Sequence, residues 1–124
     1  MAESNKDAAV SFLRLASSGK VQQAYDLYVG AGFRHHNQFF EGSAEALMKG
    51  MEENARQYPD KVLEVKRAIA EGDFVVVHSH VRQNPTDPGA AVVHIFRFDK
   101  GRLVELWDVG QPVSAKSPNQ YGVF

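Results

Sequence analysis

The spacing of apolar residues changes about halfway along the chain. Up to Pro59 the apolar residues recur at every third or fourth position, which is the pattern of amphipathic helices. From Lys61 onward they recur at every second position, which is typical of β-strands. The sequence therefore predicts a mainly helical first half and a sheet-forming second half, as in an α+β domain.

Three helices and one short strand are predicted in the first half. The helices are expected over residues 4–19, 21–29 and 43–58, and the strand over residues 33–37. Ser4 and Ser43 precede the first and third helices and are typical N-cap residues. Gly30 and Gly32 are expected to end the second helix.

Four longer strands are predicted in the second half, over residues 62–70, 74–82, 90–98 and 102–109. The intervening sequences EGD, NPTDPG and DKG favour turns, so consecutive strands are expected to be antiparallel neighbours. The order α-α-β-α-β-β-β-β predicts a single domain over residues 1–124, with helices packed on one face of a sheet. The segment from Pro112 to Phe124 is irregular, and its pattern predicts neither a helix or strand nor a position in the fold.

Composition narrows the classes of function. The 124 residues, 44% hydrophobic and 23% charged, fit one globular domain with a genuine core. A net charge of -1 without a Lys/Arg stripe argues against nucleic acid and membrane partners. The absence of cysteine excludes disulfides, thiol catalysis and zinc–thiolate sites. MAESNKDAAV lacks the apolar stretch of a signal peptide, so a soluble cytoplasmic protein is expected.

Asp108 stands between apolar residues in the last predicted strand, where a free carboxylate is costly to desolvate. We interpret it as the acid or base of an apolar pocket that takes a small hydrophobic molecule. Arg34 and His36 share one side of the short strand and are expected to act with it. The residues expected to contact the substrate are His78, His80, His94, Phe96, Leu106 and Tyr25.

Each of these residues also has a structural interpretation. Asp108 would then bond backbone amides or Arg34, and the histidines would be core or solvated residues. A metal is a rival hypothesis, because the pair His78 and His80, with His36 and Asp108, offers three imidazoles and one carboxylate. Two histidines on one strand face are common, so we expect no metal and no cofactor.

Three segments carry a resemblance to a known family. They are RHHNQFFEGSAEAL at 34–47, EGDFVVVHSHV at 71–81 and VVHIFRFDKGRLVELWDVGQPV at 92–113. The pair His36–Asn37 before Gly42, the Gly101 turn and the string from Glu105 to Gln111 are similar to motifs of the SnoaL-like polyketide cyclases. This branch belongs to the ketosteroid isomerase and nuclear transport factor 2-like superfamily.

The resemblance implies a cone-shaped fold, in which a curved, mainly antiparallel mixed sheet wraps around three helices and encloses a deep pocket. In the cyclases an aspartate of the last strand removes a proton next to a carbonyl group. Limonene epoxide hydrolase, a relative, has an aspartate seven residues after the turn glycine, and Asp108 stands seven residues after Gly101. The hydrolase's tyrosine and second carboxylate have no counterpart here, which argues against epoxide hydrolysis.

Two hypotheses for function follow. The first is a cofactor-free enzyme of the polyketide cyclase, aldol-condensation or isomerase type, acting on a hydrophobic carbonyl compound. In it Asp108 is the base, and His36 with Arg34 stabilises the enolate oxygen. The alternative is a non-catalytic module of the same fold that binds small molecules or supports assembly.

The sheet face turned away from the pocket is also expected to be apolar. Its predicted members are Val75, Val77, Val81, Val93, Ile95, Leu103, Trp107 and Val109. Exposed apolar faces mark association, so we expect a homodimer through this outer face with Trp107 near its centre. The alternative is that the C-terminal tail folds back over the face.

Overall fold

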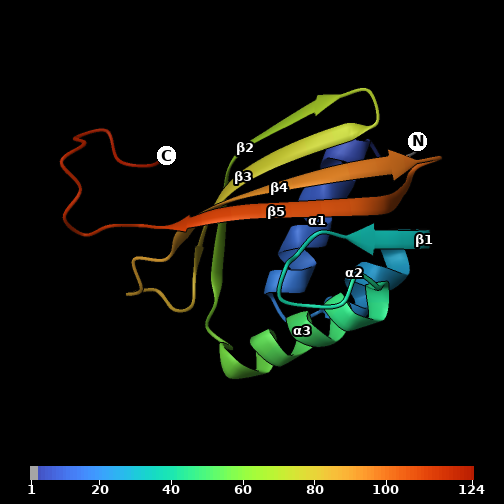
Figure 1. The fold of residues 1–124 in the computed structure, drawn as a ribbon, viewed down its shortest axis with the longest axis horizontal. Helices are drawn as coiled ribbons and strands as arrows, with labels where there is room; N and C mark the ends of the chain where they lie inside the picture. The colour runs from blue at the N-terminus through green and yellow to red at the C-terminus, as the bar shows by residue number, and fades with distance from the viewer. Residues whose placement is uncertain (1–2) are drawn as a thin grey trace.

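Three helices lie against one face of a five-stranded sheet in the computed structural model, which describes residues 3–124 (Figure 1). The helices are α1 (Asn5–Ser17), α2 (Val21–Tyr28) and α3 (Ala44–Gln57), and the strands are β1 (Val29–His35), β2 (Val62–Glu71), β3 (Phe74–Arg82), β4 (Ala90–Asp99) and β5 (Arg102–Pro112). The predicted order of elements is confirmed. α3, the longest helix, has 14 residues, and within residues 3–124 no helix meets the length and hydropathy that a bilayer crossing requires.

Local side-chain chemistry sets where the helices begin. The Oγ atom of Ser4 accepts a hydrogen bond from the backbone N–H of Asp7 at 3.1 Å, and that of Ser43 accepts one from Ala46 at 3.1 Å. Both predicted N-caps are therefore confirmed.

The first strand begins four residues earlier than predicted. Gly30, expected to end α2, lies inside β1 instead. A Cβ atom at Gly30 would lie 2.8 Å from the Cβ of Arg102, so the glycine allows β1 to approach β5 closely.

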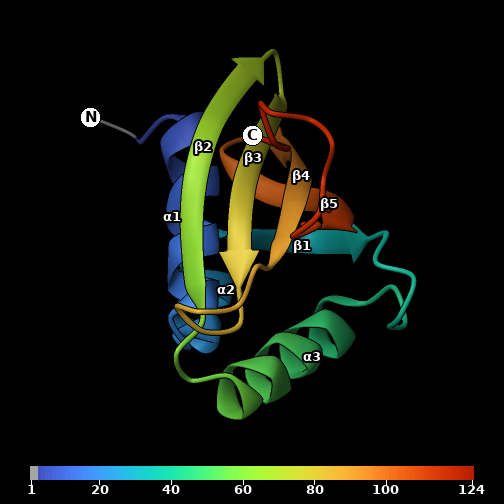
Figure 2. The same ribbon diagram turned by 90° about the vertical axis from the view of Figure 1, so that its left-hand side faces the viewer.

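The strand order in the sheet is β1-β5-β4-β3-β2. β1 runs parallel to β5, and the other neighbours are antiparallel, so the sheet is mixed and mainly antiparallel as expected. Figure 2 shows β2 and β3 bending along the helical layer, with α1 beside β2 and α3 below the sheet. This open, curved arrangement is the nuclear transport factor 2-like cone fold.

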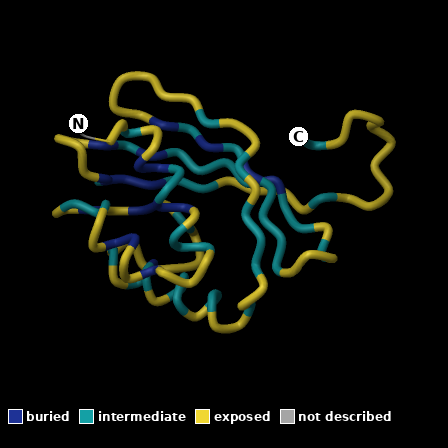
Figure 3. The backbone as a smooth tube through the Cα atoms, turned by 180° about the vertical axis from the view of Figure 1, so that it is seen from behind, coloured by how far each residue is buried: buried dark blue, intermediate teal, exposed yellow. Residues whose placement is uncertain are grey.

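The core lies between the concave face of the sheet and the first two helices. Phe12 of α1 is fully buried and meets Phe96 of β4 edge to face, with ring centroids 6.1 Å apart. Its neighbours in the core include Leu13, Ala24, Tyr25, Val75, Val77, Phe98, Leu103 and Leu106. Buried residues run through the middle of the sheet and the inner side of α1, and exposed residues mark the turns and the C-terminal tail (Figure 3).

The face predicted for β3 is wrong. Val75 pairs with Phe96 and Val77 with His94, and directly opposed residues share a face. Val75 and Val77 are therefore buried against the helices, instead of facing outward. Periodicity of two has two possible phases, and the NPTDPG turn does not determine which residues of β3 and β4 stand opposite each other.

Leu103 was also predicted outward and is buried in the core. Arg97 pairs with Glu105 while the next residue of β4, Phe98, pairs with Leu103. Val104 is thus the extra residue of a β-bulge, which returns Leu103 and Leu106 to the same side of the sheet. Simple alternation along the strand does not reveal such an insertion.

The outer face of the sheet is partly apolar and partly covered. Val109 is 65% exposed and Phe74 43% exposed. The tail returns to one end of this face, where the ring of Phe124 packs on His80 at 4.6 Å and on His78 at 5.6 Å. Val109 and Phe74 remain exposed beyond the reach of the tail, so the homodimer stays a prediction for this part of the face.

We expect Val109→Arg to convert a dimer into a monomer, because an arginine at this exposed position would place charge within the apolar contact. Sedimentation equilibrium at micromolar concentration measures the change. Leu27→Arg is the matched control, since Leu27 is 49% exposed on α2, away from the sheet's outer face. Wild-type protein that sediments at 13.8 kDa would contradict the prediction.

Candidate functional site

A cavity of about 310 Å³ lies between the sheet and helices α1 and α3. Its apolar lining comprises Leu13, Ala16, Leu47, Met51, Leu63, Val81 and Val92. Its polar lining comprises Ser17, Asn37, Asn54, Lys61, His94 and Asp108. An apolar wall with a few convergent polar groups is the usual composition of a small-molecule site.

Asp108 reaches this cavity from β5 and is held by one neutral donor. The side-chain amide of Asn37 donates a hydrogen bond to Asp108 Oδ2 at 2.9 Å. The same asparagine accepts a hydrogen bond at Oδ1 from the backbone N–H of Phe39 at 3.0 Å. Asn37 therefore fixes the carboxylate and the loop after β1 together, and leaves the carboxylate without a cationic partner among residues 3–124.

His94 stands directly opposite Asp108 on the neighbouring strand β4. Burial lowers the pKa of His94 from 6.5 to about 4, although the nearby Asp108 charge acts in the opposite direction. Its Nδ1 atom is buried without a hydrogen-bond partner among the described residues. The imidazole is therefore neutral at pH 7 and lies beside the carboxylate at the cavity wall.

Phe40 stands at the mouth of the cavity, on the loop between β1 and α3. Its side chain lines the cavity while 43% of the residue is exposed. A Cβ atom at Gly50 would lie 2.6 Å from the Phe40 ring, so the ring rests directly on the backbone of α3. His35 secures the loop from beneath, because its Nε2 atom bonds the Glu41 carbonyl at 2.6 Å.

A second, larger hollow of about 610 Å³ follows α1 but lacks these properties. It is a shallow groove lined by charged surface residues of α1, among them Lys6, Asp7 and Arg14. Charges of both signs that remain in water are ordinary for a helix surface. The cavity that contains Asp108 is therefore the candidate site.

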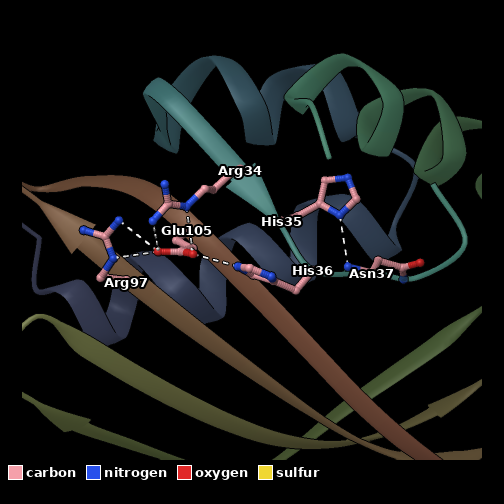
Figure 4. Close-up of polar contacts among 6 residues, drawn as sticks. All are labelled: Arg34, His35, His36, Asn37, Arg97 and Glu105. Atoms are coloured by element: carbon pink, nitrogen blue, oxygen red, sulfur yellow. Dashed lines mark hydrogen bonds and ion pairs between the residues drawn. The ribbon is translucent and has the colours of Figure 1, made fainter. Parts of the chain in front are cut away.

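Arg34 and His36 do not lie with Asp108, contrary to the sequence-based expectation. Both extend toward Glu105 on the outer face of the sheet (Figure 4). Arg34 Nε donates to Glu105 Oε2 at 2.9 Å, and His36 Nε2 lies 2.7 Å from the same oxygen. The reason is that β1 pairs with β5 at Arg34 and Glu105, and Glu105 and Asp108 project from opposite faces of β5.

Glu105 is the centre of an ionic cluster. Its side chain is only 6% exposed, and Arg97 on β4 adds a third partner at 3.0 Å. Hydrogen bonds from Arg34 and then His36 lower the pKa of Glu105 from 4.5 to about 2, with Arg97 contributing further. The His36 ring also stacks on Trp107, with centroids 4.9 Å apart. This cluster fastens β1 to the sheet.

His78 and His80 also lie on the outer face, so their predicted place in the pocket is wrong. They pair with Val93 and Ala91 on the face opposite His94. His78 contacts Arg67 of β2, and His80 Nε2 lies 2.7 Å from the Pro88 carbonyl. The four residues of the metal hypothesis are thereby divided between the two faces. Within residues 3–124, no group of three or more His, Asp or Glu side chains has the arrangement of a metal site.

The three remaining predicted contacts lie in the core beside the cavity. Phe96 and Leu106 are buried on the concave face, as their alternation predicted, but they do not line the cavity. Tyr25 is buried as well and points its hydroxyl at the sulfur of Met51, 3.6 Å away. Burial, and then the charge of Glu52, raises the pKa of Tyr25. These residues support the cavity wall from behind.

Sequence reasoning missed three residues of importance. Asn37 bonds both the backbone N–H of Phe39 and the carboxylate of Asp108, and the second bond was not predicted. Alternation places Asn37 on the side of the strand opposite His36, but only the pairing of β1 with β5 shows that Asp108 lies on that side. Lys61 and Glu105 gave no comparable signal, because a charged residue next to a strand or within it is usually solvated.

Replacing Glu105 with glutamine should lower the free energy of unfolding at pH 7 by on the order of 2 kcal/mol, because three donors lose their anionic acceptor. The pKa of Glu105 is lower in the fold than in the unfolded chain, so its ionised carboxylate contributes its full stabilisation above pH 4.5. This contribution is lost as the pH falls toward 2. Urea denaturation at several pH values should therefore show the two proteins converging in acid.

Glu53→Gln is the control for this experiment, since Glu53 forms an exposed pair with Arg56 on α3. It should change the stability little at any pH. A Glu105→Gln protein as stable as wild type at pH 7 would show that the cluster does not fasten the sheet.

The neutral His94 gives a second pH dependence. An unfolded histidine binds a proton below about pH 6.5, whereas His94 in the fold binds one only near pH 4. As the pH is lowered from 6.5 to 4, the free energy of unfolding should decrease by roughly 3 kcal/mol, because the unfolded state binds more protons than the fold in this range. NMR titration of the imidazole and denaturation of His94→Gln test this. A titration midpoint near 6.5 would contradict it.

Comparison with known proteins gives the same fold. AclR from Streptomyces galilaeus, for which a hydroxylase activity is proposed, is 24% identical, with a TM-score of 0.73 over 86% of this chain and 88% of that one. IdmH from Streptomyces antibioticus, for which a polyketide cyclase activity is proposed, is 16% identical, with a TM-score of 0.71 over 88% and 93%. A SnoaL-like protein of unknown function from Burkholderia thailandensis is 15% identical, with a TM-score of 0.72 over 90% and 98%.

Sequence comparison identifies the family. Among curated proteins, no sequence matches this chain. The family profile of the SnoaL-like domain matches residues 9–106, which run from the middle of α1 into β5 and include most of the cavity lining. The chain belongs to the SnoaL-like domain family.

Proposed function

We propose that this protein is a cofactor-free enzyme that removes a proton next to the carbonyl group of a small, largely hydrophobic compound. One observation carries the proposal: Asp108 and His94 stand side by side on the wall of an otherwise mainly apolar cavity. A carboxylate and a neutral imidazole are the two groups that enolisation requires, one as the base and one as the hydrogen-bond donor.

Asp108 is the proposed base. Its Oδ2 atom accepts a hydrogen bond from the Asn37 amide at 2.9 Å, which fixes the orientation, and the second oxygen has no hydrogen-bond partner among residues 3–124. The C–H electron pair of the substrate would move to the carbonyl oxygen as the proton passes to Asp108. Asn37 acts as a positioning residue, because it holds the base and is itself fixed by the loop.

His94 is the proposed donor to the enolate oxygen. Because its pKa is about 4, the ring is neutral at pH 7 and carries one N–H. This replaces the donors predicted from the sequence, since Arg34 and His36 lie on the other side of the sheet. A neutral donor also suits the proposed role of Asp108 as the base, because an imidazolium beside a carboxylate lowers the affinity of that carboxylate for a proton.

The family is consistent with this chemistry at a coarse level. IdmH, a structural neighbour, is proposed to be a polyketide cyclase, and cyclisation by aldol chemistry begins with removal of a proton next to a carbonyl. At 16% identity the likeness establishes the shared fold alone. The assignment for this chain therefore depends on its own cavity residues.

Exchange of α-protons for deuterium tests the proposal without knowledge of the natural substrate. Wild-type protein is incubated in D2O with 2-tetralone and 4-oxo-4-phenylbutanoate, and proton NMR follows the loss of the α-C–H signals. We expect Asp108→Asn to lower the exchange rate at least about 100-fold, the usual contribution of a positioned base. Asp99→Asn makes the same change at an exposed carboxylate and should have no effect.

Retention of exchange in Asp108→Asn would show that Asp108 is not the base. Absence of exchange in the wild type, with ligand binding retained, would favour the alternative of a binding module. Chemical-shift changes of His94 on ligand addition distinguish that case from a cavity that binds neither compound.

A further inference from the structure

Lys61 is a cationic residue at the cavity wall, and it has no role in the proposed proton transfer. It follows α3 and directly precedes β2, and its side chain is half-buried at the cavity wall. Its Nζ atom donates a hydrogen bond to Oδ1 of Asn54, a neutral acceptor. Among residues 3–124, no carboxylate forms an ion pair with Lys61.

An ammonium group without a counter-charge is unfavourable in such a place. Burial lowers the pKa of Lys61, which is the expected response of a lysine that lacks an anionic partner. A ligand anion placed at Nζ would restore the missing charge and offset the desolvation. A cation that faces a cavity in this way is suited to recognise a carboxylate.

The order of the strands separates Lys61 from the base. β5 and β2 are three strand positions apart in the sheet, with β4 and β3 between them. At about 4.8 Å per strand this corresponds to roughly 14 Å along the sheet, which the curvature shortens across the cavity. Asp108 and Lys61 therefore approach a ligand from opposite ends, with His94 on β4 between them.

This arrangement suits a ligand with two functional groups. An anion held at Lys61 stays away from the negative charge of Asp108, while a ketone at the other end lies within reach of Asp108 and His94. The mainly apolar walls of the cavity would contact the aromatic or branched body of such a ligand.

We propose that the cavity binds an oxo acid, with its carboxylate held by Lys61 and its ketone against Asp108 and His94. The position of the ketone rests on the proposed function. The position of the carboxylate rests on Lys61 alone.

A matched pair of compounds tests the site. 4-Oxo-4-phenylbutanoate and its methyl ester share the aromatic ring and the ketone and differ in the negative charge. Calorimetry at pH 7 should show the wild type binding the acid at least about tenfold more tightly than the ester, as expected for a charge-assisted hydrogen bond. Equal affinities, or binding of neither compound, would overturn the proposal.

Variants assign the preference to Lys61. Lys61→Met should abolish the preference while retaining ester binding, and Lys61→Arg should keep it. Lys116→Met, which removes a charge from the exposed tail, should behave as wild type. A Lys61→Met protein that still prefers the acid would overturn the proposal. If Lys61→Met does not fold, the affinities of the wild type and of Lys61→Arg for the acid and the ester still test the proposal.

The two proposals fail separately. Acid preference in the absence of α-proton exchange would retain the anion site and reject the chemistry. Exchange at equal rates with acid and ester, together with equal affinities, would retain the chemistry and reject the anion site. Asp108→Asn should keep the preference for the acid, because it leaves Lys61 unchanged.

Discussion

The attachment of β1 to the sheet through Glu105 is the constraint on which the site depends. β1 is a short edge strand with an irregular register, and it pairs with β5 alone. A single buried carboxylate of β5 binds Arg34 of this strand, His36 directly after it and Arg97 of β4, so one acidic group joins three strands. The loop that begins at Asn37 leaves the end of β1, and its position over Asp108 follows from that attachment. The ionic contacts of Glu105 on the convex side of the sheet therefore fix the position of the Asn37 amide on the concave side.

The two faces of β5 have separate tasks because of strand geometry. Glu105 and Trp107 project outward, where the indole stacks on His36, and Leu106 and Asp108 project inward. The β-bulge at Val104 brings Leu103 into the core as well, so an ionic cluster and a hydrophobic core share one strand. The opposite orientation of Glu105 and Asp108 keeps the strongly paired carboxylate on the outer face, away from the carboxylate that lines the cavity.

The sequence predicted the order of elements, both serine caps and the antiparallel pairing of the last four strands, because these depend on local chemistry and on periodicity. It also predicted that Asp108 would face a pocket. It failed where the answer depends on how distant segments align. The faces of His78 and His80 follow from the register across a long turn, and that of Leu103 from an inserted residue. The partners of Arg34 and His36 follow from a parallel pairing of residues some 70 positions apart, which no local pattern contains.

The contact between Phe40 and Gly50 has a consequence for how molecules enter the cavity. The ring at the mouth fills the space that a side chain at position 50 would occupy, so an aromatic face and bare helix backbone bound the opening together. A larger residue at position 50 would meet this ring and alter which molecules the opening admits, while β4 and β5, which carry His94 and Asp108, would remain as they are.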